Sequence, residues 1–256
     1  MALAVGTLAS TANADEVVVF SAGSLRAPLT DIAAAFESQT GNKTRLTFGA
    51  SGLLRDRIGS GEHADVFASA NMEHPRGLAA FGWTSSVDRF ARNTMCVLAR
   101  PGLDITPANV LATLLDRAIS VGTSTPKADP SGDYAWDVFR KADVVRPGAF
   151  ATLTAKAWQL TGGPQSPPPP PDRNVYAMHV TSGAVDVFVT YCTNAALARR
   201  EQPALKAVKL PPALNVAADY GMSVRHDASP AARAYAAFML GPPGQRILAA
   251  YGFDPP

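Results

Sequence analysis

The chain has 256 residues, of which 47% are hydrophobic and 17% charged, and its 23 Lys and Arg against 21 Asp and Glu give a formal net charge of +2. This length is sufficient for one large domain or for two lobes of about 100–150 residues each. The balanced charge argues against a nucleic-acid-binding protein, and no apolar run reaches the roughly 18–20 residues of a membrane-spanning helix. Two cysteines are too few for a disulfide-rich scaffold or a four-cysteine zinc site.

The N-terminal residues 1–14 are small or apolar, and no charged side chain occurs before Asp15. Ala12-Asn13-Ala14 fits the small-x-small pattern of a secretory cleavage site. We therefore predict that residues 1–14 are the remnant of a signal peptide and that the protein is periplasmic; the alternative is an Ala-rich leader with no targeting role. An oxidising compartment would permit a disulfide between Cys96 and Cys192, and the sequence leaves open whether it forms.

The first third of the chain alternates between strand and helix patterns. Short apolar runs typical of buried strands occupy residues 17–20, 44–48 and 65–69. Amphipathic helix patterns occupy 29–36, with a stop near Gly41, and 53–58. This βαβαβ order indicates an open, doubly wound α/β sheet.

The rest of the chain continues the alternation. The strands expected here are 95–99, 119–122, 153–157, 185–191 and 220–224, and the helices are 134–141, one that starts near Val175, 230–240 and 243–251. Five consecutive prolines at 167–171 predict a polyproline II segment in a surface loop. A rigid spacer is the favoured role for this run, ahead of a recognition element.

Four strand-to-helix turns share one design, in which a small or hydroxylic residue precedes the start of a helix. They are Gly23-Ser24, Ala50-Ser51-Gly52, Pro130-Ser131-Gly132 and Asn174-Val175. A helix N-terminus presents unpaired N–H groups and the positive end of the peptide dipoles, which favours anions. In a doubly wound sheet such turns lie at the carboxyl ends of the strands, where ligands bind. One such serine alone is best interpreted as a helix cap, but four turns together favour an anion site.

Motifs for catalysis are scarce. The sequence has no His-Glu-x-x-His motif, no Gly-x-Ser-x-Gly elbow and no Gly-rich phosphate loop. Its histidines form no close metal pair; they are His63, His74, His179 and His226. There are two alternatives from other functional classes. One is an enzyme on the same fold, with Cys192 or Asp65 as the reacting group, and the other is a cytoplasmic sensor domain. We expect a binding protein rather than an enzyme, with no cofactor.

Three stretches carry a resemblance to a known family: VFSAGSL at 19–25, TFGASG at 47–52 and ADVFASAN at 64–71. Weaker matches lie at 129–134, at the Val175 turn, at 189–191 and at 244–253. Together they make the chain, from Val17 to Phe253, resemble the periplasmic molybdate-binding proteins, which are the solute-binding components of ABC importers. The combination of the second and third stretches is fairly specific, whereas either alone is weak.

The resemblance implies a type II periplasmic binding protein fold, with two α/β lobes joined by two hinge strands. We expect lobe 1 at 15–92 plus 214–256 and lobe 2 at 93–213. In this family the anion lies in the cleft without a cationic side chain, and no side chain binds the metal directly. By motif position the hydroxyls are those of Ser24, Ser51 and Tyr191, and the backbone amides are those of Ser51, Ser131 and Val175. Ser24 and Ser51 are expected on lobe 1, and the other three residues on lobe 2.

The expected ligand is molybdate or tungstate, ahead of sulfate and phosphate. A site built only from donors has no acceptor for the proton of a protonated phosphate, and sulfate is smaller than molybdate. The alternative within the class is a binder of sulfate, phosphonate or a small carboxylate. The expected partners are the oxyanion and the permease of an ABC transporter, with no nucleic acid, and we expect a monomer.

Overall fold

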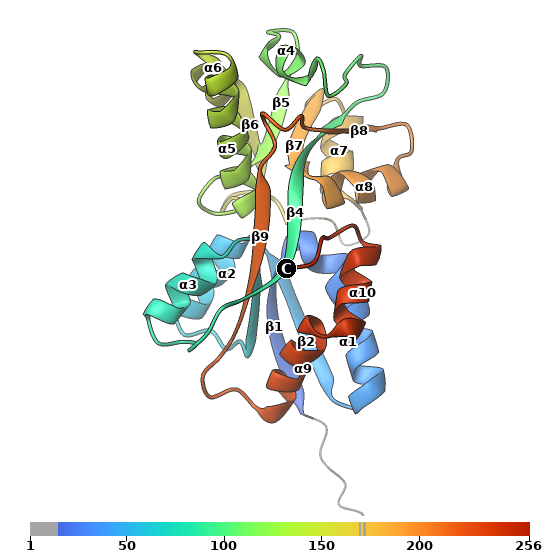
Figure 1. The fold of residues 1–256 in the computed structure, drawn as a ribbon. Coiled ribbons are helices and arrows are strands. Elements are labelled where there is room, and N and C mark those ends of the chain that lie inside the picture. Colours follow the sequence, from blue (N-terminus) through green and yellow to red (C-terminus); the bar gives the residue numbers. More distant parts are fainter. Residues whose placement is uncertain (1–14, 169, 171–172) are drawn as a thin grey trace, which may run out of the picture.

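The computed structural model of the protein describes residues 15–168, 170 and 173–256. The predicted leader at 1–14 and part of the proline run lie outside the described residues. Figure 1 shows two α/β lobes, one above the other, with two long strands passing through the waist between them. The expected fold class, two α/β lobes joined by hinge strands, is confirmed.

The lower lobe in Figure 1 is built on three parallel strands. Strand β1 (Glu16–Ala22) lies between β2 (Lys43–Gly49) and β3 (Val66–Ser69). The helices of this lobe are α1 (Arg26–Thr40), α2 (Ser51–Gly59), α3 (Glu73–Ala80), α9 (Pro230–Leu240) and α10 (Pro242–Ala250). Helix α1 buries Leu29, Ile32 and Phe36, whose spacing places them on one face of a helix. Part of the core of this lobe therefore lies between α1 and one face of the sheet, and a second cluster lies between the other face and helices α2 and α3.

The upper lobe repeats the arrangement. Strand β5 (Val121–Ser124) lies between β6 (Ala157–Thr161) and β7 (Val187–Tyr191), and all three are parallel. Strand β8 (Lys206–Lys209) pairs with β4. The helices of this lobe are α4 (Val110–Leu115), α5 (Pro130–Val145), α6 (Ala149–Lys156), α7 (Val175–Thr181) and α8 (Cys192–Glu201).

Strands β4 (Asp88–Ala99) and β9 (Ala217–Val224) connect the lobes. The first half of β4, up to Thr94, pairs with β9, which also pairs with β3 in the lower lobe. The second half of β4, from Met95, pairs with β7 in the upper lobe. The lobe boundaries at 92/93, within β4, and at 213/214, before β9, stay predictions.

One predicted element is wrong, and several were missed. Residues 153–156, expected in a strand, belong to helix α6, and strand β6 starts only at Ala157. Ala149 and Leu153, four residues apart, are the buried residues of α6, so the short apolar run belongs to one face of a helix. The sequence patterns also did not indicate α3, α4, α8 or β8.

The two cysteines form a disulfide. Cys96 lies on β4 and Cys192 is the first residue of α8, and their Cα atoms are 4.8 Å apart. The bond therefore fixes the start of α8, directly after Tyr191, to a strand that connects the lobes.

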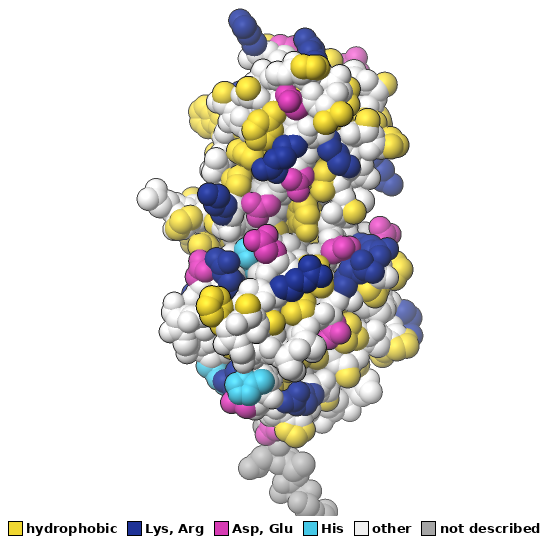
Figure 2. All heavy atoms as spheres, turned by 60° about the vertical axis from the view of Figure 1, so that its left-hand side comes forward, with side chains coloured by type: hydrophobic (Ala, Val, Ile, Leu, Met, Phe, Trp, Pro, Cys, Tyr) yellow, Lys and Arg dark blue, Asp and Glu magenta, His cyan; other side chains and the backbone are white. Residues whose placement is uncertain are grey.

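The surface carries both signs of charge. Figure 2 shows Lys and Arg side chains interspersed with Asp and Glu over one face of both lobes. This face presents no continuous basic stripe, in keeping with the near-neutral composition. Within the described residues, no helix is long and apolar enough to cross a membrane.

Candidate functional site

A cavity of about 370 Å³ lies between the two lobes. Strands β1, β2 and β3 end at its lower wall and β6 and β7 at its upper wall, so the carboxyl ends of the two parallel sheets face each other across it. The lower wall includes Ala22, Gly23, Ser24, Gly49, Ala50 and Ala70, and the upper wall includes Asp129, Thr161, Gly162, Asn174, Val175 and Tyr191. The volume is near the lower end of the roughly 300–1,000 Å³ typical of small-molecule sites.

Ser24 is placed at the cavity by the short 3-10 turn between β1 and α1. Its hydroxyl is 3.0 Å from the hydroxyl of Tyr220 on β9, and Asn93 on β4 donates its side-chain amide to Tyr220 at 3.4 Å. Ser24 is therefore linked to both strands that connect the lobes. The Tyr220 hydroxyl can accept from Asn93 and donate to Ser24, which leaves the Ser24 proton available to a ligand.

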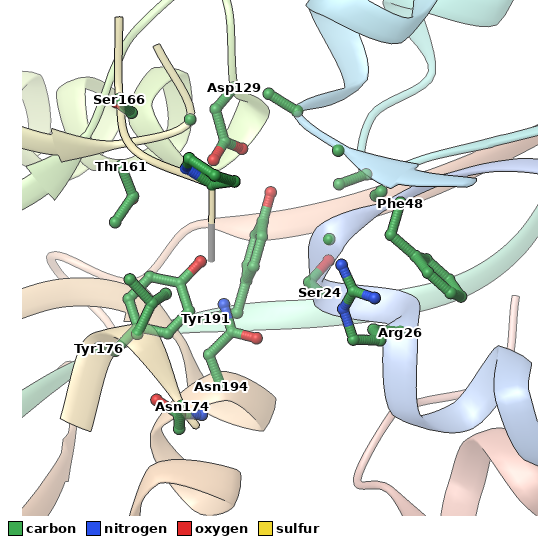
Figure 3. A pocket seen from close by; sticks show the side chains of 18 of the residues that line it. Ser24, Arg26, Phe48, Asp129, Thr161, Ser166, Asn174, Tyr176, Tyr191 and Asn194 are labelled. Carbon is green, nitrogen blue, oxygen red and sulfur yellow. The ribbon is translucent and has the colours of Figure 1, made fainter. Parts of the chain in front are cut away.

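Tyr191 ends strand β7 and is 1% exposed. Its hydroxyl has no hydrogen-bond partner among the described residues, although it lines the cavity. Figure 3 shows this hydroxyl extending into the cavity, with Asp129 on one side and Ser24 on the other. Burial, with the neighbouring Tyr220 and Tyr134, raises the pKa of Tyr191 well above its ordinary value, so it stays a protonated donor.

The third predicted residue on the cavity wall is Val175, the first residue of α7. The side chain of Asn174 caps this helix by accepting a hydrogen bond from the amide of Ala177 at 2.9 Å. No described residue accepts a hydrogen bond from the Val175 amide. This amide is thus a donor at the positive end of a helix, beside Tyr191.

Ser51 and Ser131 differ from the other three predicted residues, because neither lines the cavity. Ser51 is 1% exposed, and its hydroxyl accepts a hydrogen bond from the amide of Ala70 at 3.1 Å. The Ser131 amide donates to Asp129 at 3.0 Å, and the buried Ser131 hydroxyl has no described partner. Ala50, next to Ser51, and Asp129, two residues before Ser131, do reach the wall, so ligand contact by the two serines stays a prediction.

The start of α2 contacts the upper lobe directly. The amide of Gly52 donates to the carbonyl of Ala128 at 2.9 Å. A Cβ atom at Gly52 would lie 2.6 Å from the carbonyl oxygens of both Lys127 and Ala128. Only glycine permits this approach, which closes one side of the space between the lobes.

Three charged residues on the cavity wall were not indicated by the sequence. Arg26 lies over the ring of Phe48, 4.7 Å from its centroid, and Arg173 donates to Glu201 at 2.7 Å. Asp129 caps α5 and faces the cavity. Two arginines therefore border the cavity, and the expectation that no cationic side chain holds the anion stays a prediction. Arg26 follows and Arg173 precedes a turn that the sequence did single out, and this closeness in the chain was the only signal available for them.

The fold and the cavity define a two-lobed solute-binding protein. The chain matches, over residues 17–254, the family described as bacterial extracellular solute-binding protein, and it belongs to that family. The family consists of substrate-binding proteins of transport systems and is not a class of enzymes.

Individual relatives agree with this assignment. An uncharacterised protein of Pasteurella multocida is 34% identical over 207 residues, which cover 80% of this chain and 85% of the relative. The molybdate-binding protein ModA of Azotobacter vinelandii is 33% identical over 144 residues, covering 55% and 56% of the two chains. The solved periplasmic molybdate-binding protein of Azotobacter vinelandii superimposes with a TM-score of 0.75 at 20% identity, covering 94% of this chain and 99% of that one.

Proposed function

We propose that this protein captures molybdate or tungstate in the cavity between its lobes and delivers it to the permease of an ABC importer. The observation that carries the proposal is the convergence of Ser24, Tyr191 and the Val175 amide on one cavity from both lobes. We further propose that it acts as a periplasmic monomer. ModA proteins among its relatives support the choice of ligand.

Neutral donors are sufficient to hold such a dianion. Each charge-assisted hydrogen bond contributes about 1.5–3 kcal/mol, so about six give ~9–18 kcal/mol before costs. Association and ordering cost at least ~4 kcal/mol. A net free energy near −8 to −12 kcal/mol corresponds to a Kd between about 1 μM and 1 nM. Because the hydroxyls and amides belong to different lobes, the bound anion also stabilises the closed arrangement.

A thermal-shift panel of molybdate, tungstate, sulfate and phosphate tests the ligand. At 100 times Kd a ligand stabilises the folded state by about 2.7 kcal/mol, which raises the Tm of a chain of this size by about 5–10 °C. We expect molybdate and tungstate to give the largest shifts. Equal affinity for sulfate, measured by calorimetry, would reject this ranking.

Ser51→Ala tests whether the Ser51 hydroxyl contacts the ligand. We expect molybdate binding to weaken by about 1–3 kcal/mol, together with a loss of stability, because the Ala70 amide loses its acceptor. Ser69→Ala is the matched control, since Ser69 is buried at the end of β3 and, within the described part of the chain, its hydroxyl hydrogen-bonds to Asn71. Ser69→Ala should lose stability without losing affinity. A Ser51→Ala variant that binds like the parent removes Ser51 from the site.

Gly52→Ala tests the contact between α2 and the upper lobe. The added Cβ would push the Lys127 and Ala128 carbonyls away, at a cost of about 1–3 kcal/mol in the closed arrangement. We expect molybdate affinity to fall about tenfold or more, while the Tm of the ligand-free protein changes little. Gly59→Ala at the other end of α2, where a Cβ meets nothing within 4 Å, should bind normally. Unchanged affinity in Gly52→Ala would show that closure does not require this contact.

A further inference from the structure

Among the described residues that line the cavity, Asp129 is the one hydrogen-bond acceptor that carries a charge. We propose that Asp129 is a specificity-determining residue of the anion site: a fully deprotonated tetrahedral dianion binds together with one proton, held between a ligand oxygen and the Asp129 carboxylate. This inference rests on the proposed function, since it concerns the same cavity and the same ligand class.

Asp129 is held in place on the cavity wall. It is the N-cap of α5 and its Oδ1 accepts from the amide of Ser131 at 3.0 Å. On the other side the backbone of Gly162 packs so closely that a Cβ there would collide with Oδ2 of Asp129. Figure 3 shows the carboxylate on the same side of the cavity as the Tyr191 hydroxyl. The charge of Asp129 also contributes to the raised pKa of Tyr191, so the two groups face the same part of the cavity.

The charge of Asp129 is not neutralised by the groups around it. Within the described residues it forms no ion pair. Asp133, one turn along α5, adds negative charge, while Tyr176 on α7 and Tyr191 on β7 have pKa values raised by burial and stay neutral. The two arginines on the cavity wall have other contacts, Glu201 for Arg173 and the Phe48 ring for Arg26.

Burial raises the pKa of Asp129 to about 6, although the Ser131 amide and the Ser124 hydroxyl oppose the shift. An adjacent dianion repels the carboxylate and raises this pKa further. Below pH 6 the free protein already holds the proton, so affinity for the dianion is constant there. Above pH 6 one proton must be taken from solvent, and Kd rises about tenfold per pH unit until the pKa of the complex is reached.

Asp129 also changes the expected selectivity. The sequence predicts a site of donors only, in which the proton of hydrogen phosphate would lack an acceptor. An ionised Asp129 supplies that acceptor, and hydrogen phosphate brings its own proton. Discrimination between molybdate and hydrogen phosphate should therefore weaken as pH rises.

The test is calorimetric titration with molybdate between pH 6 and 9, in two buffers of different ionisation enthalpy at each pH. We expect Kd to rise with pH and about one proton to be taken up per anion at pH 8. Asp129→Asn keeps a residue suited to cap α5 and carries no titrating group. It should bind molybdate with little pH dependence, without proton uptake, and more tightly than the parent at pH 8.

Asp133→Asn is the matched control, because Asp133 is nearby and accepts from the Lys127 amide at 2.8 Å but does not line the cavity. Asp133→Asn should keep the parent's rise of Kd with pH and its proton uptake on binding. If the Kd of the parent does not change with pH, or if the Asp129→Asn variant keeps the parent's dependence of Kd on pH, this inference is wrong while the proposed function still stands. Absence of molybdate binding at every pH would contradict the proposed function and this inference with it.

Discussion

Tyr191→Phe is expected to weaken molybdate binding about 10- to 150-fold without destabilising the ligand-free protein. The variant loses one charge-assisted hydrogen bond of about 1.5–3 kcal/mol. The Tyr191 hydroxyl is buried with no described partner, so its removal leaves no new unsatisfied group, and the Phe ring can keep the contacts with Tyr134 and Tyr220. Calorimetry gives the affinity, and chemical denaturation of the ligand-free protein gives the stability.

Tyr235→Phe is a close control for this variant. Tyr235 on α9 is also buried, its hydroxyl also lacks a described partner, and its ring packs on Phe36 in the lower lobe. It does not line the cavity. We expect it to bind molybdate like the parent. If Tyr191→Phe also binds like the parent, the unpartnered hydroxyl on β7 does not contact the anion.

Removal of the Cys96–Cys192 bond is expected to have the largest effect on stability. The bond links residues 96 positions apart, and the chain-entropy model gives about 4.7 kcal/mol for a loop of roughly 100 residues, with measured losses of about 2–5 kcal/mol. A Cys96→Ser, Cys192→Ser double variant should therefore unfold at a clearly lower urea concentration than the oxidised parent. Urea denaturation followed by circular dichroism measures the difference.

A reducing agent supplies the matched comparison. It should lower the unfolding midpoint of the parent towards that of the double serine variant and leave the variant itself unchanged. An oxidised parent whose midpoint does not respond to complete reduction, verified by thiol titration, would show that the bond contributes little to stability.

The order of the main elements could be predicted from hydrophobic patterns. The βαβαβ opening follows from apolar runs at 17–20, 44–48 and 65–69, and the structure places strands on each of them. The full length of β4 could not be predicted in the same way, because only residues 95–99 form a continuous apolar run. Its first half pairs with β9, a distant segment, and this pairing is not visible in local sequence.

In the site, too, local sequence patterns predicted some residues, whereas others depend on contacts between distant segments. Ser24, Val175 and Tyr191 follow strand ends, and such positions are visible in the sequence and converge on the cavity. The acceptor role of Asp129 and the positions of Arg26 and Arg173 depend on how the two lobes face each other. The relative position of the two lobes cannot be predicted from local sequence patterns, so these three residues were missed.

The most direct test of the proposed site is a crystal structure of the protein grown with molybdate, with diffraction data collected on both sides of the molybdenum absorption edge. We predict one anomalous peak in the cavity, with ligand oxygens within hydrogen-bonding distance of the Ser24 and Tyr191 hydroxyls. A cavity without an anomalous peak at a molybdate concentration that saturates the protein in solution, or a peak bound elsewhere on the surface, would contradict this prediction.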